Sequence, residues 1–398
     1  MDITIFPRKL SGTIEAIPSK SQAHRILICA AFSDKPTAIR CPATNNDIDA
    51  TVDCLNALGA KIVNAHDGFL VTPVQSIPSS AVLNCRESGS TLRFMLPICA
   101  ALGVDATFLM AGRLPSRPLS PLWEELMAKG CVLSRPDAST IRCQGKLQSG
   151  SFTIDGGISS QFITGLMFAL ALLPGDSQLH ITGKVESKPY IDMTRSVLDA
   201  FGVATDGVHF GNLFPFHSPG QITVEGDWSN GAFFVAAAAL GNDVNITGLD
   251  PKSSQGDRAI CDLAEALNQN ITISGEDIPD LIPILAVIAG AKQGATFENI
   301  GRLRLKESDR IESVRAMLTA LQVYALTGEN WIQVSPGLYE GCTIDAGNDH
   351  RIAMSAAIAA TVAHGPVTIL GAECVNKSYP DFWSDYAKLG GYYEQHIR

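Results

Sequence analysis

The chain contains 398 residues, of which 46% are hydrophobic and 18% charged, and it carries a formal net charge of −10 at pH 7. This composition excludes a disordered or low-complexity protein, and the length suggests two domains of roughly 200 residues each. The longest apolar runs, residues 162–174 and 281–289, are too short to span a bilayer. Since the net acidity also argues against a nucleic-acid partner, we expect neither membrane nor nucleic acid as a partner.

Residues 1–20 alternate apolar and polar side chains and contain no signal-peptide core, so we expect a cytoplasmic protein. The ten cysteines are scattered at irregular spacings, with no Cys-x-x-Cys pair and no Cys/His cluster. We therefore expect reduced, mostly buried thiols and no metal site.

Six apolar helical stretches follow one another along the chain, and each opens with small, polar or charged residues. They begin at residues 19–21, 87–90, 159–161, 227–229, 277–280 and 348–351. Such stretches predict buried helices. Each is followed by a short β-branched run that closes at Cys41, Gly112, Gly183, Gly248, Gly301 or Gly371. A second, more polar helix then ends near residues 58, 129, 201, 267, 321 or 389. The pattern indicates six copies of one strand–helix–strands–helix unit.

One unit is shorter than the others. The closures at Gly248 and Gly301 are 53 residues apart, whereas the other successive closures are 65 to 71 residues apart. We expect a hairpin to be missing from the fifth unit, between Asn268 and Asp277.

Positive charges recur at the starts of these helices. A helix N-terminus is a ready anion site because its N–H groups are unpaired and carry partial positive charge. The segments 88–91 and 159–161 could equally be ordinary N-caps. However, Lys20, Arg25, Arg93 and the pair 350–351 lie inside otherwise apolar helices. A charge there is costly unless it faces a ligand or a partner.

The segment 301–310 concentrates Arg304, Lys306 and Arg310 around two carboxylates, Glu307 and Asp309. Positive charge with a carboxylate inside it suits an enzyme that binds a phosphorylated acid and moves a proton. The alternative is a solvated helix start whose charges pair with one another.

Nine ordered motifs covering essentially the whole chain resemble the EPSP synthase (3-phosphoshikimate 1-carboxyvinyltransferase) family. They are IPSKSQAHR (17–25), ESGSTLR (87–93), LPSRP (114–118), SSQ (159–161), SKPYID (187–192), IPD (278–280), KESDR (306–310), NDHR (348–351) and NKSYP (376–380). Any one would be weak, but nine in the family's order make coincidence implausible.

The resemblance implies an α/β fold, a two-domain inside-out α/β barrel. It would consist of six βαβαββ repeats, three in each domain, with helices inside and sheets outside. Residues 1–18 and 226–398 would form a discontinuous domain with the proton-transfer and phosphoenolpyruvate residues. Residues 19–225 would form the domain with most shikimate 3-phosphate residues. Closure of the two domains would complete the site.

The resemblance also implies a transferase reaction. The enolpyruvyl group of phosphoenolpyruvate moves to the 5-hydroxyl of shikimate 3-phosphate, giving 5-enolpyruvylshikimate 3-phosphate and phosphate by addition and elimination through a tetrahedral intermediate. This is a step of the shikimate pathway to chorismate and the aromatic amino acids, and glyphosate occupies the phosphoenolpyruvate site of sensitive members. No cofactor is implied. The internal pseudo-symmetry removes the need for a dimer, so we expect a monomer.

The same resemblance assigns candidate site residues. Asp280 would take the hydroxyl proton, Glu307 would serve the methylene carbon, and Lys20 would protonate the bridging oxygen or the leaving phosphate. The residues expected to bind shikimate 3-phosphate are Lys20, Ser21, Arg25, Ser159, Ser160, Gln161, Ser187, Tyr190, Asp280 and Lys306. Those expected to bind phosphoenolpyruvate are Lys20, Gly89, Arg117, Gln161, Arg310, Arg351 and Lys377. Further candidates are His350 and Arg93. We interpret His24 and Asp192 as structural, and the role of Arg302 stays open.

Two alternative functions differ in kind. UDP-N-acetylglucosamine 1-carboxyvinyltransferase shares the fold and the donor, but that family carries a reactive Cys in the loop before its Arg-Pro, and residues 111–118 contain none. The other alternative is a non-catalytic repeat scaffold, against which the net acidity argues.

Overall fold

The computed structural model describes residues 1–203, 205–211 and 215–396. The chain divides into two compact units, a discontinuous unit of Met1–Ile17 and Gly226–Arg398 and a continuous unit of Pro18–Glu225. Pro18 therefore belongs to the continuous unit, one residue away from the expected boundary. Each unit has its own hydrophobic core. The two connecting segments run side by side, since Ser19 N donates to Glu225 O and Asp227 N donates to Ile17 O, both at 2.8 Å.

Within its described residues, the continuous unit contains three sheets, with strand orders β13-β3-β5-β4, β6-β7-β9-β8 and β10-β11-β12. Its elements are α1 (Lys20–Ala31), β3 (Thr37–Arg40), α2 (Asn46–Ala57), β4 (Lys61–Ala65), β5 (Gly68–Thr72), β6 (Ser80–Asn84), α3 (Gly89–Leu102), β7 (Asp105–Leu109), η1 (Leu114–Ser116), α4 (Leu122–Ala128), β8 (Cys131–Asp137), β9 (Thr140–Gly145), β10 (Ser151–Asp155), α5 (Ser160–Leu172), β11 (Ser177–Thr182), α6 (Lys188–Ala200), β12 (His209–Phe210) and β13 (Gln221–Thr223). Each sheet contains one parallel pair of strands, and an antiparallel strand pairs with one member of that pair. Along the chain, β6 and β7 flank the buried helix α3, and β10 and β11 flank α5.

Up to His396, where its description ends, the discontinuous unit also contains three sheets, with strand orders β19-β20-β1-β21, β15-β16-β18-β17 and β14-β2. Its elements are β1 (Asp2–Phe6), β2 (Ser11–Glu15), α7 (Trp228–Ala239), β14 (Asp243–Thr247), η2 (Gly256–Ala259), α8 (Ile260–Ala266), β15 (Ile271–Ser274), α9 (Ile282–Ala291), β16 (Ala295–Glu298), η3 (Gly301–Leu305), α10 (Arg310–Ala320), β17 (Ala325–Thr327), β18 (Ile332–Val334), β19 (Cys342–Asp345), α11 (His350–Ala360), β20 (Val367–Leu370), η4 (Ala372–Lys377), α12 (Phe382–Lys388) and β21 (Tyr392–His396).

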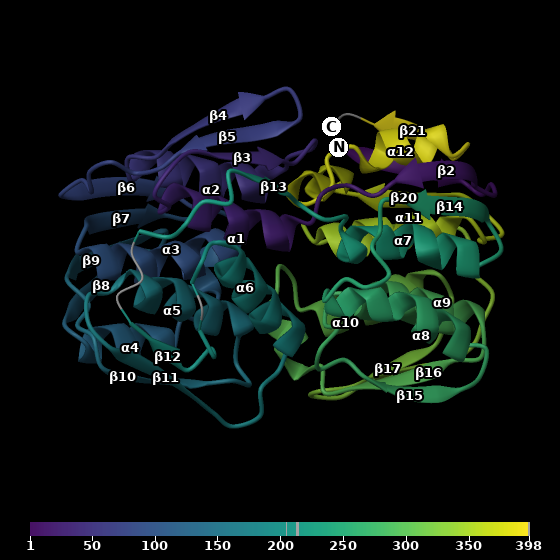
Figure 1. The fold of residues 1–398 in the computed structure, drawn as a ribbon. Coiled ribbons are helices and arrows are strands. Elements are labelled where there is room, and N and C mark those ends of the chain that lie inside the picture. The colour runs from purple at the N-terminus through teal and green to yellow at the C-terminus, as the bar shows by residue number, and fades with distance from the viewer. Residues whose placement is uncertain (204, 212–214, 397–398) are drawn as a thin grey trace. The chain divides into compact units, whose positions relative to one another are not determined.

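The predicted succession of elements is confirmed. The six apolar stretches form α1, α3, α5, α7, α9 and α11, and the more polar ones form α2, α4, α6, α8, α10 and α12. Helices α3, α5, α9 and α11 are buried over nearly their whole lengths, because they are apolar on all sides. Within each unit the sheets lie at the periphery and these helices lie between them (Figure 1).

The expected missing hairpin is visible in the sheet formed by β2 and β14. These two parallel strands make a two-stranded sheet in the described part of the chain, whereas the other sheets of the discontinuous unit have four strands each. The segment after α8 leads directly into β15, which pairs with β16. The shortened repeat is therefore the one built around α7, the fourth apolar helix, and not the fifth as expected from the spacing.

Most polar helix starts are N-caps. The side chains of Ser19, Ser88 and Ser159 each accept a backbone N–H of the first turn of α1, α3 and α5. The ten cysteines are free thiols, and most of them are buried, as expected. In the described residues, no helix is long and apolar enough to cross a bilayer.

Candidate active site

The predicted residues of the continuous unit gather at the starts of four helices. Lys20, Ser21 and Arg25 lie in the first two turns of α1, Gly89 and Arg93 in those of α3, Ser159, Ser160 and Gln161 at the start of α5, and Ser187 and Tyr190 at the start of α6. Arg117 follows directly after η1. The side-chain contacts of these residues show which of the helix starts lie together.

Arg93 joins the starts of α3 and α5. Its Nη1 donates to Gln161 Oε1 at 2.6 Å, and Gln161 Nε2 donates to Ser90 Oγ at 2.9 Å. Arg93 Nη2 donates to Pro118 O at 3.0 Å, next to Arg117. Arg93 is 4% exposed, so its cost of burial is offset by these contacts. The arginine holds two predicted ligand-binding segments against each other.

Arg25 joins α1 and α6 in the same way as Arg93 joins α3 and α5. Its Nε donates to Thr194 Oγ1 at 2.9 Å and its Nη2 donates to Tyr190 O at 3.1 Å. The guanidinium lies 5.3 Å from the centre of the Phe94 ring, which belongs to α3. Burial lowers the pKa of Arg25 to about 10, so this side chain remains a cation at neutral pH.

Gly89 and Arg117 lie in direct contact. A Cβ atom added at Gly89 would lie 2.6 Å from Arg117 Nη1, closer than van der Waals contact allows. The guanidinium therefore occupies space at the start of α3 that only glycine leaves open. Two residues predicted to bind one phosphate are thus brought together.

Lys20 has a carboxylate partner that the sequence did not reveal. Its Nζ lies 2.9 Å from Asp47 Oδ2, and both side chains are 16% exposed. Asp47 lies in the first turn of α2, where an acidic residue is ordinarily favourable. That position gave no sign of a contact with a predicted catalytic residue.

In the discontinuous unit, Arg310 is the centre of a charge cluster. It is 1% exposed, and its Nε and Nη2 donate to the two oxygens of Asp349 at 2.9 and 3.3 Å. Its Nη1 donates to Asp280 Oδ1 at 2.9 Å, and Nη2 also donates to Glu307 Oε2 at 2.7 Å. The cluster brings together the starts of α10 and α11 and the segment before α9.

Asp280 lies between two arginines. Its Oδ1 accepts from Arg310, and its Oδ2 accepts from Arg351 Nη2 at 3.1 Å. Lys306 Nζ lies 3.8 Å from Asp280 Oδ1. Burial alone would raise the pKa of Asp280, but Arg351, Lys306 and Arg310 outweigh it and hold that pKa well below its ordinary value. Burial lowers the pKa of Lys306 to about 8, although Asp280 opposes the shift.

The charged segment 301–310 divides into two parts. Arg304 Nη1 lies 2.8 Å from Asp309 Oδ2, and Asp309 is the N-cap of α10. For this pair the interpretation as self-paired helix-start charges is correct. Lys306, Glu307 and Arg310 instead belong to the cluster around Asp280.

The remaining candidates lie close to this cluster along the chain. His350 is 3% exposed in the first turn of α11, and Lys377 Nζ donates to Asn348 O at 2.7 Å. Arg302 donates to the backbone carbonyl of Glu276, a structural contact.

Sequence reasoning missed two further carboxylates. Asp349 is 0% exposed, caps α11 through Arg351 N, and accepts Ser308 Oγ at 3.0 Å besides Arg310. Its only signal was its place before His350, where a capping acid is common. Asp257 accepts the Ser229 hydroxyl, and burial, with Asp280 nearby, raises its pKa to about 6.

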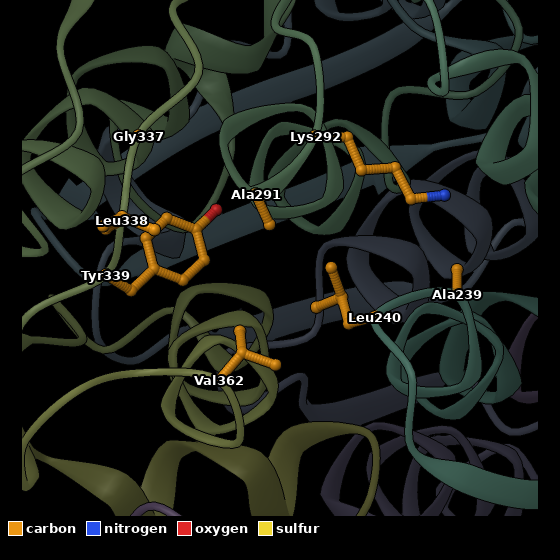
Figure 2. Close-up of a pocket in the computed structure, with 8 residues that line it drawn as sticks. All are labelled: Ala239, Leu240, Ala291, Lys292, Gly337, Leu338, Tyr339 and Val362. Atoms are coloured by element: carbon orange, nitrogen blue, oxygen red, sulfur yellow. The ribbon is translucent and has the colours of Figure 1, made fainter.

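No group of three or more His, Cys, Asp or Glu side chains in the described residues is arranged to hold a metal ion. A cavity of about 260 Å³ lies at the C-terminal ends of α7, α9 and α11, away from the helix starts (Figure 2). Figure 2 shows the side chains of Lys292, Tyr339 and Val362 at its border. It contains none of the predicted site residues.

One set of cations surrounds helix N-termini, and the other is interleaved with carboxylates. The cations of each set can bind anionic groups, and the carboxylates and lysines among these residues can transfer protons. An α/β fold that carries such charged groups is typical of an enzyme that acts on small anionic substrates.

Comparison with known proteins narrows this class. The family model for EPSP synthase (3-phosphoshikimate 1-carboxyvinyltransferase) matches residues 6–386. The chain is 36% identical to the 3-phosphoshikimate 1-carboxyvinyltransferase of Clostridium beijerinckii, over 99% of this chain and 98% of that protein. It is 35% identical to that of Clostridium kluyveri, over 98% and 97%. With matches of this extent, the chain belongs to the EPSP synthase family.

Solved structures agree at the level of fold. An EPSP synthase from Acinetobacter baumannii superposes with a TM-score of 0.79 at 21% identity, covering 99% of this chain and 100% of that one. The enolpyruvyl transferase NikO from Streptomyces tendae gives 0.75 at 17% identity, covering 100% and 99%. The mixed α/β fold is therefore shared with enolpyruvyl transferases.

Proposed function

We propose that the chain transfers the enolpyruvyl group of phosphoenolpyruvate to the 5-hydroxyl of shikimate 3-phosphate and releases phosphate, a step in aromatic amino-acid biosynthesis. The observation that carries the proposal is the charge cluster of the discontinuous unit, in which Asp280 and Glu307 are both held by Arg310. Family membership over residues 6–386 supplies the substrates.

We further propose that the two units are the domains of an inside-out α/β barrel that close over the substrates. The continuous unit would bind most of shikimate 3-phosphate through Ser159, Ser160, Gln161, Ser187 and Tyr190. The discontinuous unit would supply the proton-transfer groups and the arginines for the phosphoenolpyruvate carboxylate. The protein would act as a monomer, because a single chain carries both sets.

The phosphate of phosphoenolpyruvate would bind at the start of α3, against Gly89, Arg117 and Lys20. Unpaired helix N–H groups and cations favour a dianion there. The contact between Gly89 and Arg117 supports this assignment.

The carboxylate of phosphoenolpyruvate would bind Arg351 and Arg310 unequally. The Nε/Nη2 edge of Arg310 already makes a two-point contact with Asp349. Arg310 therefore offers a ligand only Nη1, and that group now donates to Asp280. The planar fork of Arg351 supplies the remaining contacts.

The position of Asp280 couples binding to proton transfer. Its carboxylate occupies N–H groups of both arginines, which makes it a weak base in the free enzyme. An incoming carboxylate competes for the same donors, and its negative charge raises the pKa of Asp280. Asp280 thus becomes a better acceptor for the 5-hydroxyl proton when phosphoenolpyruvate is bound.

The remaining bond changes follow in two stages. The 5-oxygen loses its proton to Asp280 and bonds to C2 of phosphoenolpyruvate, while C3 gains the proton of Glu307 in its protonated form and becomes a methyl group. The bond from C2 to the phosphate oxygen then breaks, a methyl proton returns to Glu307, and Lys20 protonates the leaving phosphate. The proton that Asp280 took from the 5-hydroxyl then passes to Lys20 and restores its charge. Lys306 would hold the phosphate of shikimate 3-phosphate.

The test is phosphate release from phosphoenolpyruvate in the presence of shikimate 3-phosphate, of UDP-N-acetylglucosamine, or of neither. Release only with shikimate 3-phosphate, with the enol ether product seen by ³¹P and ¹H NMR, is the expected result. Release with the nucleotide sugar would favour the alternative transferase, and no release in any arm would favour a non-catalytic scaffold.

A further inference from the structure

Helix α2 carries no predicted substrate residue, yet it contacts the two helices that carry Lys20 and Gly89 (Figure 1). Its first turn supplies Asp47, which pairs with Lys20 at the start of α1. One turn later, Thr51 is 0% exposed and lies between α1 and α3. Asp47 and Thr51 therefore connect α2 to the starts of both helices.

Thr51 is the middle of a buried chain of hydrogen bonds. His24 Nδ1 lies 2.7 Å from Thr51 Oγ1, which lies 2.8 Å from Thr91 Oγ1. The Thr91 hydroxyl donates to Ser88 Oγ at 2.7 Å, and a longer contact of 3.4 Å reaches Asp47 O. Ser88 Oγ accepts Thr91 N and caps α3 immediately before Gly89.

The direction of these hydrogen bonds follows from the last of them, which Thr91 donates to Ser88. Because each hydroxyl has one proton, Thr91 donates to Ser88 and must accept from Thr51. Thr51 then accepts from His24, which requires the tautomer with the proton on Nδ1. His24 is 0% exposed, and its Nε2 has no hydrogen-bond partner in the described residues. Burial, with Lys20 and Arg25 nearby, holds the pKa of His24 well below its ordinary value, so the ring is neutral.

We propose that Thr51 is a positioning residue for the phosphoenolpyruvate phosphate site, holding with His24 the start of α3 at a fixed place relative to Lys20. The inference rests on the proposed function and deepens it. Asp47 fixes Lys20 to α2, and Thr51 fixes the cap of α3 to the same helix. A small shift between those two groups changes the geometry of phosphate departure and is costly to the rate.

The chain offers a matched control. Thr37 Oγ1 lies 2.7 Å from Ser218 Oγ, in another buried hydroxyl pair of the continuous unit. Thr37 starts β3, beyond the C-terminal end of α1 and away from the helix starts. Thr51→Val and Thr37→Val each remove one buried hydroxyl with little change of shape, and both should lower thermal stability.

Steady-state kinetics of the parent, Thr51→Val, Thr51→Ser and Thr37→Val test the proposal. We expect Thr51→Val to raise KM for phosphoenolpyruvate about tenfold and lower kcat, with KM for shikimate 3-phosphate within about twofold. Thr51→Ser, which keeps the hydroxyl, should restore most of the loss, and Thr37→Val should match the parent. Parental kinetics in Thr51→Val, or an equal rise of both KM values, would overturn the proposal.

A second measurement does not depend on a stable variant. ¹⁵N NMR of the parent should show His24 as the neutral Nδ1–H tautomer from about pH 6 to 8. An Nε2–H tautomer, or a ring that titrates in that range, would contradict the hydrogen-bond direction and overturn the inference. A parent protein without turnover would instead contradict the proposed function. The NMR result would then remain as the test of the hydrogen bonds from His24 through Thr51 to Thr91.

Discussion

The two units differ in the groups to which their buried arginines donate. In the continuous unit, Arg25 and Arg93 donate to hydroxyl, amide and backbone carbonyl oxygens, which are neutral. In the discontinuous unit, Arg310 and Arg351 donate to carboxylates, with Asp280 shared between them. The first arrangement uses its arginines to join helix starts, while Lys20 of the same unit is paired with Asp47. The second stores a carboxylate on its arginines, so that an incoming anion must displace it.

This difference assigns different tasks to the two sets. Helix N-termini and the cations beside them favour phosphate binding, and at Lys20 the phosphate would compete with Asp47. A neutralised cluster binds a carboxylate less tightly, but binding changes the protonation of its own acids. Binding of the phosphoenolpyruvate phosphate would thus depend mainly on the continuous unit, and proton transfer would be controlled mainly by the discontinuous unit.

The largest expected effects concern proton transfer, with one residue in each unit. Lys20→Met and Glu307→Gln should each lower kcat at least about 10²-fold, the lower range for a positioned acid or base. Single-turnover rates at saturating substrates measure the effect. Near-parental turnover in a folded variant would remove that residue from the mechanism.

The second-largest expected effect concerns the free energy of unfolding. Removing the carboxylate partner of a cation should cost more in the discontinuous unit than in the continuous unit. Asp349→Asn keeps a helix cap but removes the carboxylate from buried Arg310, and we expect a loss of about 3 kcal/mol in the free energy of unfolding. Asp47→Asn removes the partner of the partly exposed Lys20 and should cost less than about 1 kcal/mol. Urea denaturation of both variants decides this, and equal losses would contradict the contrast between the units.

Asp280→Asn tests whether the Asp280 carboxylate competes with the substrate carboxylate for Arg310 and Arg351. Without the negative charge on the two arginines, the free enzyme should bind phosphoenolpyruvate about tenfold more tightly while turnover falls. Isothermal titration without shikimate 3-phosphate measures the affinity. Unchanged or weaker binding by the variant would show that Asp280 does not compete with the substrate carboxylate.

Gly89→Ala tests the proposed phosphate site of the continuous unit. The added methyl group would push Arg117 aside, since the Cβ position is 2.6 Å from its Nη1. We expect glyphosate to inhibit the parent competitively with phosphoenolpyruvate, and the variant to lose inhibition by at least about tenfold. Because Arg117 moves, KM for phosphoenolpyruvate should also rise, though less. An insensitive parent, or a variant with parental inhibition constants, would exclude this glycine as the determinant.

The fold could be predicted from the sequence because each repeat carries its own local signals. An apolar stretch after a polar start, and a β-branched run after it, depend on neighbours a few residues away. The carboxylate partners could not be predicted in this way. Asp349 lies 39 residues from Arg310, and Asp47 lies 27 residues from Lys20, so only the packing of separate helices brings each pair together. Both acids also stand at helix starts, where an acid is common without any partner.

The shortened repeat illustrates the same limit. The spacing of the glycines revealed that strands were missing, but the sheet that lost them is defined by β2, which pairs with β14 from 232 residues away. Strand β2 lies near the start of the chain but belongs to the repeat of β14. Because the two strands are so far apart in sequence, no periodic pattern connects them.

The smallest expected effect is a pH dependence that separates the two sets of cations. Burial lowers the pKa of Lys306 to about 8, whereas Arg25 keeps its charge up to a pKa of about 10. Lys306 loses its positive charge as the pH rises through about 8, so kcat/KM for shikimate 3-phosphate should fall several-fold between about pH 8 and 9. Lys306→Arg should remove that fall, because a guanidinium stays charged there.

The same shift has a consequence for stability with the opposite sign. Since the pKa of Lys306 is lower in the folded state than in the unfolded chain, the unfolded chain binds more protons between about pH 8 and 10. This lysine therefore favours the folded state as the pH rises through that window, while substrate affinity falls. Parallel profiles of kcat/KM and of urea midpoint, in the parent and in Lys306→Arg, test both signs. An activity limb that persists in the arginine variant would assign the titration to another group.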